Sequence, residues 1–376
     1  MHLNLSTEEL GAWVRLSLEP GLGPAQARSL LAAIGLPQDI YAMSTAGLGK
    51  FLPGDLARQL KQAPSDEMQE AIHNTLQWLE YPSHHLLTLA DPAYPRALLD
   101  THDPPILLYA NGNLGLLSRP IISIVGARSA TAGGTDNARA FARYLAEQGW
   151  CIASGLALGI DTAAHEGALL AGPNGASTIA ILGTGIDIVY PARNRELAHR
   201  IAQDGILISE FPLGTRALPY QFPKRNRLVA GVARGVLVVE AAKQSGSLIT
   251  ARLASEIGRE VFAIPGSIHS PLSRGCHALI RQGAKLVESG KDILEELGSA
   301  PVESPTPGPG KGTARKQPAA DPSGLLVLEA LGYDPVHLDA LQERSGLDIA
   351  TLTARLLEFE LQEVVARLDD GRFQRR

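Results

Sequence analysis

Short apolar runs that alternate with helical stretches between Arg119 and Gly298 constrain the fold most. The runs are continuous rather than alternating, which is typical of strands that helices cover on both faces. Right-handed crossovers then place the helices, for example 136–148 and 247–257, on both sides of a doubly wound parallel sheet. The strands are expected at 121–125, 151–154, 178–182, 206–209, 236–240, 261–264 and 285–287, with a short extra strand at 106–109.

Glycine-containing loops follow several of these strands, at the end where such sheets bind ligands. The first loop reads Gly126-Ala127-Arg128-Ser129. Glycine lets the backbone approach a phosphate, and Arg128 can hold it with two N–H groups. The loop is not the dinucleotide fingerprint, because Gly-x-Gly-x-x-Gly is absent. The alternative is a tight turn with a surface arginine.

The run Phe222-Pro223-Lys224-Arg225-Asn226-Arg227 is the most specific element. The chain has a formal net charge of −5, yet between Phe211 and Arg252 seven basic residues accompany one acid, Glu240. A local excess of one sign indicates an anionic partner. We expect an exposed segment rather than a core helix, with Lys224, Arg225 and Arg227 neutralising phosphates and Phe222 or Tyr220 stacking on an unpaired base. The alternative is a solvated surface.

Two further loops carry hydroxyl groups. Ser154 and Gly155 follow the second strand, and Asp161 and His165 lie one helical turn apart soon after. Two ligands are too few for a metal site, so a capping and packing role is favoured and no metal is expected. Ser245-Gly246-Ser247 begins a helix, where Ser247 would act as N-cap while the helix start binds phosphate. The nucleophile elbow Gly-x-Ser-x-Gly is absent.

We assign the sheet domain to residues 81–298 and expect a mainly helical unit before it in the chain and another after it. Residues 1–80 contain two helices joined by Pro20-Gly21-Leu22-Gly23-Pro24, like a helix-hairpin-helix or SAM-like unit. With only Arg15 and Arg28 nearby, a tight turn is favoured over DNA contact. Residues 299–322 are rich in Pro, Gly and Ser and predict a flexible linker.

Residues 323–376 predict three helices and a β-hairpin, which resembles a winged helix. Its second and third helices carry many acids, so a protein-contact role is favoured over DNA binding. Elsewhere Cys151 and Cys276 are far apart and indicate core positions in a reduced compartment. No signal-peptide pattern or bilayer-length apolar run is present, so a cytoplasmic protein without membrane contact is expected.

Several motifs in one order resemble the DNA-processing protein A (DprA, or Smf) family. They are Gly126-x-Arg128, Ser154-Gly155-Leu156-Ala157-x-Gly159-Ile160-Asp161, Phe222-Pro223-x-Arg225-Asn226-Arg227, Ser245-Gly246-Ser247-Leu248-Ile249-Thr250 and Pro265-Gly266. The resemblance implies an extended Rossmann-like core that, as a homodimer, binds single-stranded DNA and no nucleotide cofactor, and that catalyses no reaction. It implies a recombination mediator of natural transformation, which protects incoming strands and loads RecA recombinase, with single-strand-binding protein as a further partner.

Carried over by motif, the expected DNA contacts are Gly126, Arg128, Ser129, Ser154, Gly155, Phe222, Lys224, Arg225, Asn226, Arg227 and Ser247. One departure is Leu158, where family members often carry a lysine that contacts DNA. The alternative function is a nucleotide-cleaving enzyme of the LOG type, whose motif Pro-Gly-Gly-x-Gly-Thr-x-x-Glu has no counterpart with the glutamate here. A protein scaffold that acts through the C-terminal domain is a third hypothesis.

Overall fold

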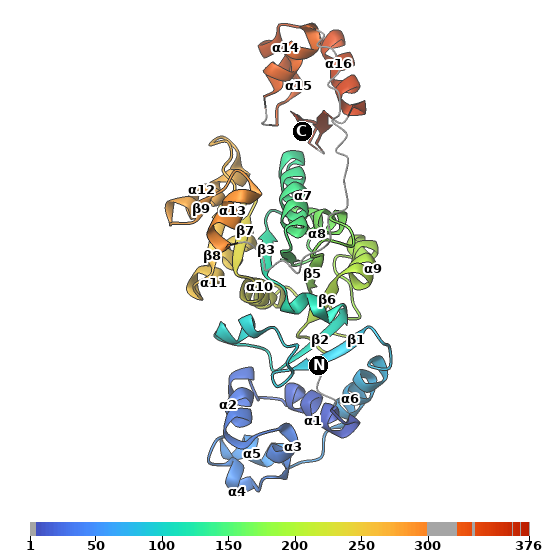
Figure 1. Ribbon diagram of the computed structural model, residues 1–376, viewed down its shortest axis with the longest axis vertical. Coiled ribbons are helices and arrows are strands. Elements are labelled where there is room, and N and C mark those ends of the chain that lie inside the picture. The colour runs from blue at the N-terminus through green and yellow to red at the C-terminus, as the bar shows by residue number, and fades with distance from the viewer. Residues whose placement is uncertain (1–4, 299–321, 333–334, 363, 369, 376) are drawn as a thin grey trace.

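The architecture is a nine-stranded sheet flanked by helices, with a helical unit at each end of the chain (Figure 1). The structure is a computed structural model that describes residues 5–298, 322–332, 335–362, 364–368 and 370–375. Nearly all of the predicted linker therefore lies outside the described residues. The strands are β1 (His84–Thr88), β2 (Leu107–Gly112), β3 (Ile121–Val125), β4 (Cys151–Ser154), β5 (Thr178–Ile181), β6 (Ile206–Ser209), β7 (Gly235–Val238), β8 (Glu260–Ala263) and β9 (Lys285–Leu286).

The strand order is β1-β2-β6-β5-β4-β3-β7-β8-β9. Strands β3 to β9 pair in parallel, while β1 and β2 extend one edge antiparallel. The chain runs outward from β3 through β4 and β5 to β6, and then returns to place β7 on the other side of β3. The loops after β3 and β7 therefore diverge at a topological switch point, where open α/β sheets bind ligands.

Helices cover both faces of the sheet because successive strand residues point to opposite sides. Ile122 and Ile124 of β3 pack under α7, α8 and α13, whereas Ile121 and Val125 pack under α10, α11 and α12. Helix α9 lies beside α8 over β5 and β6. The bounds are α7 (Ala132–Glu147), α8 (Ile160–Leu170), α9 (Arg195–Asp204), α10 (Gln221–Val232), α11 (Gly246–Glu256), α12 (Arg274–Arg281) and α13 (Gly290–Leu297).

The N-terminal helices share a hydrophobic cluster with the antiparallel edge of the sheet. Trp13 and Leu16 of α1 belong to the same buried cluster as Leu107 and Tyr109 of β2. Ser6 and Glu9 form the predicted capping box at the start of α1. The helices are α1 (Thr7–Leu18), α2 (Pro24–Ile34), α3 (Pro37–Ala42), α4 (Thr45–Leu48), α5 (Gly54–Leu60) and α6 (Asp66–Trp78).

The C-terminal unit has its own buried cluster, which includes Leu341, Leu352 and Phe373. It consists of α14 (Pro322–Leu331), α15 (Leu338–Ser345), α16 (Ile349–Leu361) and the hairpin β10 (Val365–Arg367) and β11 (Phe373–Arg375). This arrangement agrees with the predicted winged helix. Within the described ranges, none of the helices combines the length and apolarity that a membrane span requires.

The sequence prediction is confirmed for the parallel strands and wrong for one helix. Helix α10 contains Phe222–Arg227, although these residues were expected to lie outside a core helix. The helix is possible because only Arg225 turns inward, where its side chain is 4% exposed, while Pro223 and Lys224 face solvent. Strand β1 was not predicted.

Helices α7 and α8 approach closely at Gly167. A Cβ there would lie 2.2 Å from the Arg139 carbonyl oxygen. Because this oxygen belongs to the backbone, the clash cannot be relieved by a change of side-chain rotamer. We predict that Gly167→Ala lowers the free energy of unfolding by about 1–3 kcal/mol, measured by denaturant titration. Gly54→Ala is the matched control, because no atom lies within 4 Å of its added Cβ. Equal stability of the two variants would contradict the close approach.

Candidate functional site

A pocket of about 400 Å³ lies at the switch point, between the loop after β3 and the N-termini of α10 and α11. Six of the eleven predicted residues line it: Gly126, Arg128, Phe222, Arg225, Asn226 and Ser247. They come from three segments far apart in sequence. The parallel sheet brings these segments together because its strands end at the same edge.

Arg128 is the exposed cation of this pocket. Among the described residues its guanidinium makes no ion pair, and it lies 6.0 Å from the centre of the Phe222 ring. Its loop is held because Ile160 N donates to Ala127 O over 3.2 Å. Gly159, with φ of 78°, allows this contact, since a Cβ would lie 2.3 Å from that carbonyl oxygen. Arg128 is therefore a positioned cation that is free to bind an anion.

Arg225 forms the floor of the pocket and is buried. Its Nη1 donates to Ile181 O over 2.6 Å. Burial lowers its pKa to about 10, while the nearby Asp161 carboxylate opposes that shift. At pH 7 Arg225 therefore remains charged, and the Asp161 carboxylate compensates its charge. Gly155 leaves room for it, because a Cβ at that position would lie 1.8 Å from Nη1.

Asp161 is the counter-charge beneath Arg225. Burial raises its pKa, and Arg225 and two backbone amides oppose that rise. Its Oδ2 accepts from Gly155 N at 3.1 Å and from Ala157 N at 3.3 Å. The packing role expected for Asp161 is therefore found, but the expected capping role is not, because Gly159 is the N-cap of α8 and Asp161 bonds the loop before the helix. Sequence reasoning missed its pairing with Arg225, which only the fold brings near.

The N-terminus of α11 forms one wall of the pocket. Ser245, not Ser247 as predicted, is the N-cap, and its Oγ accepts from Ser247 N at 3.3 Å. Ser247 Oγ lies 2.7 Å from Ser245 Oγ. Asn226 Nδ2 reaches the Gly246 carbonyl at 3.5 Å, between α10 and α11. The partial positive charge of a helix N-terminus thus adds to that of the two arginines.

Phe222 and Tyr190 form an aromatic surface at the mouth of the pocket. Their ring centres are 5.3 Å apart, and Tyr190 is 50% exposed. Phe222 packs on Gly183, where a Cβ would lie 2.9 Å from its ring. Sequence reasoning missed Tyr190, although it follows the glycine-rich loop 183–185. Half-exposed rings of this kind can stack on nucleobases.

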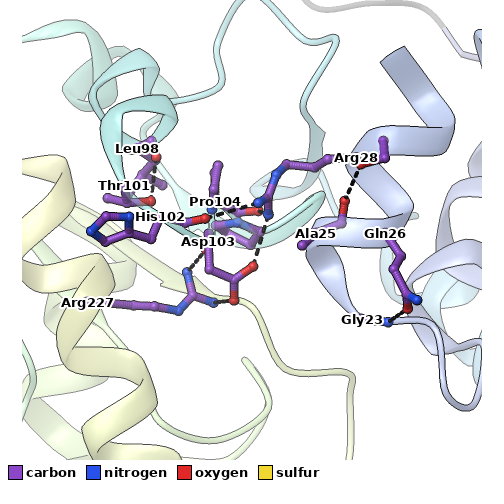
Figure 2. Close-up of polar contacts among 12 residues, drawn as sticks. Gly23, Ala25, Gln26, Arg28, Leu98, Thr101, His102, Asp103, Pro104 and Arg227 are labelled. Atoms are coloured by element: carbon purple, nitrogen blue, oxygen red, sulfur yellow. Dashed lines mark hydrogen bonds and ion pairs between the residues drawn. The ribbon is translucent and has the colours of Figure 1, made fainter. Parts of the chain in front are cut away.

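Arg227 lies outside the pocket and bonds the connector between β1 and β2, which Arg28 of the N-terminal helices also contacts (Figure 2). It pairs with Glu210 and donates to the Asp103 carbonyl. Arg28 of α2 binds the same connector, with Nη1 2.9 Å from both Asp103 Oδ1 and Pro104 O. The basic run is thus divided between the pocket and a domain contact.

The remaining predicted residues differ in accessibility. Lys224 is exposed, but its Nζ lies 3.7 Å from the buried carboxylate of Glu210. Ser154 is fully buried, and its Oγ donates to Ile124 O over 2.7 Å. Ser129 is exposed and lines a second groove beside Arg128. Ser154 and Gly155 therefore shape the pocket from behind and do not offer side chains to a ligand.

The arginines near the N-terminal glycine turn are both engaged. Arg15 Nε bonds Glu19 at 3.1 Å, and Arg15 Nη2 donates to Gln62 O over 2.7 Å. Arg28 binds the connector, as described above. This favours the structural interpretation of the turn, since neither cation faces an open surface.

Fold and site together define an α/β protein with a cationic, aromatic-edged pocket at the switch point of its sheet. The chain belongs to the DNA recombination-mediator protein A family, whose model matches residues 85–298. A DprA winged helix domain model matches residues 311–371. The resemblance stated from the motifs and the predicted fold class are both confirmed.

Relatives of the chain extend over most of its length. Protein Smf of Escherichia coli K12 is 42% identical over 305 residues, which is 81% of this chain and 80% of that protein. DNA processing protein DprA of Streptococcus pneumoniae is 47% identical over 60% of this chain and 77% of its own length. The X-ray structure of the S. pneumoniae protein superposes with a TM-score of 0.60 at 38% identity, covering 76% and 97% of the two chains.

A structure of the Helicobacter pylori DNA processing protein A also superposes, with a TM-score of 0.52 at 31% identity. It covers 57% of this chain and 95% of that one, and its description concerns a single-stranded DNA binding mode.

His165 lies buried beneath the site and should make stability depend on pH. Its Nδ1 lies 2.7 Å from Thr178 Oγ1, and that hydroxyl donates to Ile152 O, so Nδ1 must carry the proton. Burial, with a smaller effect of Arg225, lowers its pKa to about 3. Below about pH 6.5 His165 therefore binds a proton in the unfolded chain but not in the folded one. The free energy of unfolding decreases as the pH is lowered from about 6.5 towards 3.

We predict that His165→Asn, which keeps an N–H near Thr178, flattens this acid dependence. Between pH 6.5 and 4.5 the wild-type protein should lose about 2–3 kcal/mol more of unfolding free energy than the variant. Denaturant titrations at several pH values measure the difference, with pH 8 as the baseline for any packing loss. Parallel profiles for the two proteins would show that His165 is not the titrating group.

Proposed function

We propose that this protein binds single-stranded DNA at the switch-point pocket and acts as a recombination mediator. The observation that carries the proposal is Arg128, an exposed arginine without an ion pair among the described residues, beside Phe222 and a helix N-terminus. Cation and helix dipole suit a phosphate, and the aromatic ring suits a base. The proposed DNA contacts in the pocket are the six predicted residues that line it, namely Gly126, Arg128, Phe222, Arg225, Asn226 and Ser247.

The shape of the pocket favours a single strand over a duplex. A volume of about 400 Å³ fits one nucleotide rather than paired strands. Stacking on Phe222 and Tyr190 needs an unpaired base, which only a single strand exposes without cost. The binding mode described for the H. pylori relative supports the same ligand class.

We propose that the protein binds single-stranded DNA without catalysing a reaction on it. The carboxylate that lines the pocket, Asp161, is occupied by two backbone amides and by the charge of Arg225. A carboxylate held in this way is a poor general base. The nucleotide-cleaving alternative predicts base release from nucleoside monophosphates, and we expect none above the rate without protein.

The cellular role follows from family membership and remains part of the proposal. A protein that holds strands by their phosphates and unpaired bases would protect strands taken up in natural transformation. We propose that it acts as a homodimer in the cytoplasm and loads RecA onto strands covered by single-strand-binding protein. The time to RecA filament formation on such covered strands, with and without this protein, measures the loading step.

Arg128→Ala is the direct test of the pocket. We predict about tenfold weaker binding of single-stranded oligonucleotides, because one charge-assisted contact is lost. The slope of log K against log salt should fall by about 0.7, the value for one released counterion on a single strand. Lys224→Ala should have a smaller effect, since Glu210 already neutralises part of its charge.

Arg143→Ala is the matched control, because Arg143 is exposed on α7 and pairs with Glu147 away from the pocket. Fluorescence anisotropy at several salt concentrations gives both affinity and slope. An Arg128→Ala protein that binds as tightly as Arg143→Ala, with the same slope, would remove the pocket from the function.

A further inference from the structure

We propose that the single strand continues from the switch-point pocket into a second groove, where Arg193 and Arg200 bind its phosphates. This inference rests on the proposed function. The groove has a volume of about 1070 Å³ and is lined by the start of α7, by the segment from α8 to α9 and by the C-terminal hairpin. Arg128 lines both the pocket and the groove, so that the two join at this residue.

Arg193 and Arg200 are the feature that marks the groove as a site for a polyanion. Arg193 lies in the 3-10 turn η3 (Ala192–Asn194) and Arg200 in α9, and both are exposed. In the part of the chain that the structure describes, neither makes an ion pair. Exposed arginines usually gain little from surface pairing, and unpaired ones in a concave surface raise the local positive potential.

Other charges in the groove are balanced. Arg139 pairs with Asp136 and with Glu166, at 3.1 and 2.8 Å. Asp370 at the far side pairs with Arg372 at 2.6 Å. Among the described residues, Glu196 is then the one acid of the groove outside an ion pair, against Arg128, Arg193, Arg200 and Arg367. The groove is cationic after every pair is counted.

The spacing of the two arginines suits successive parts of one strand. Seven residues separate them, which at the helical rise of 1.5 Å corresponds to about 10 Å. With their backbones this far apart, Arg193 and Arg200 can reach different phosphates of one strand. Asn194, between them, is buried and donates to Leu156 O over 2.9 Å, which fixes η3 against the loop after β4.

Tyr190 packs beside the pocket and precedes Arg193 of the groove by three positions in the sequence. Its half-exposed ring packs on Phe222 of the pocket, and its segment leads directly to Arg193. A base stacked on Tyr190 would therefore lie between the phosphate held at Arg128 and those held at Arg193 and Arg200. Partly exposed Leu158, which also lines the groove, contributes no charge, so Arg193 and Arg200 supply the cations on this side.

The test compares Arg193→Ala/Arg200→Ala with Arg195→Ala/Arg58→Ala, which removes the same charge elsewhere. Arg195 is exposed on α9 but lines neither site, and Arg58 lies on α5. Oligothymidylates from three to about twenty nucleotides are titrated at several salt concentrations. We expect the groove variant to bind the long strands at least tenfold more weakly, with a slope smaller by about 1.4, the value for two counterions. Its affinity for the shortest strand that wild type binds should be unchanged.

Three outcomes would overturn the inference. Wild-type affinity of the groove variant for long strands would remove Arg193 and Arg200 from the path, and Arg128→Ala would still test the pocket by itself. Equal losses for short and long strands, or in the charge-matched control, would reveal a general effect of charge. Failure of the wild-type protein to bind any single strand would remove the pocket and the groove together. Unchanged thermal unfolding of both variants checks the fold.

Discussion

The buried pair of Arg225 and Asp161 is the interaction on which the site depends. Asp161 holds the loop after β4 through the amides of Gly155 and Ala157, and its charge keeps Arg225 ionised under the pocket. Arg225 in turn joins α10 to the carbonyl of Ile181 at the end of β5. These two buried charges, with the hydrogen bonds that each makes, therefore connect two strand ends and the helix that presents Phe222.

A second buried carboxylate controls how much of the basic run faces outward. Glu210 follows β6, and its side chain is 4% exposed. Burial raises its pKa, and Arg227 and Lys224 oppose that rise. Lys224 and Arg227, two of the three cations in the run 222–227, are thereby directed to Glu210. The pocket instead obtains its exposed charge from Arg128, and the groove obtains its charge from Arg193 and Arg200.

The fold could be predicted further than the site, for a physical reason. Continuous apolar runs identify buried parallel strands directly, and β3, β4 and β6 begin and end as expected. An excess of basic residues can be counted in a short stretch of sequence. Which of those residues form ion pairs depends on acidic residues that only the fold brings near them. Glu210 lies just outside the counted run, and Asp103 lies over a hundred residues away from Arg227. For the same reason Tyr190, Arg193 and Arg200, which belong to no basic run, were missed.

The contact that Asp103 makes with both Arg28 and Arg227 has a consequence for how the molecule responds to a ligand. Helix α10 carries the pocket residues at its start and Arg227 one turn further on, and Arg28 fixes α2 to the same connector (Figure 2). A displacement of this helix would therefore alter the pocket and the contact with α2 together, because α10 takes part in both.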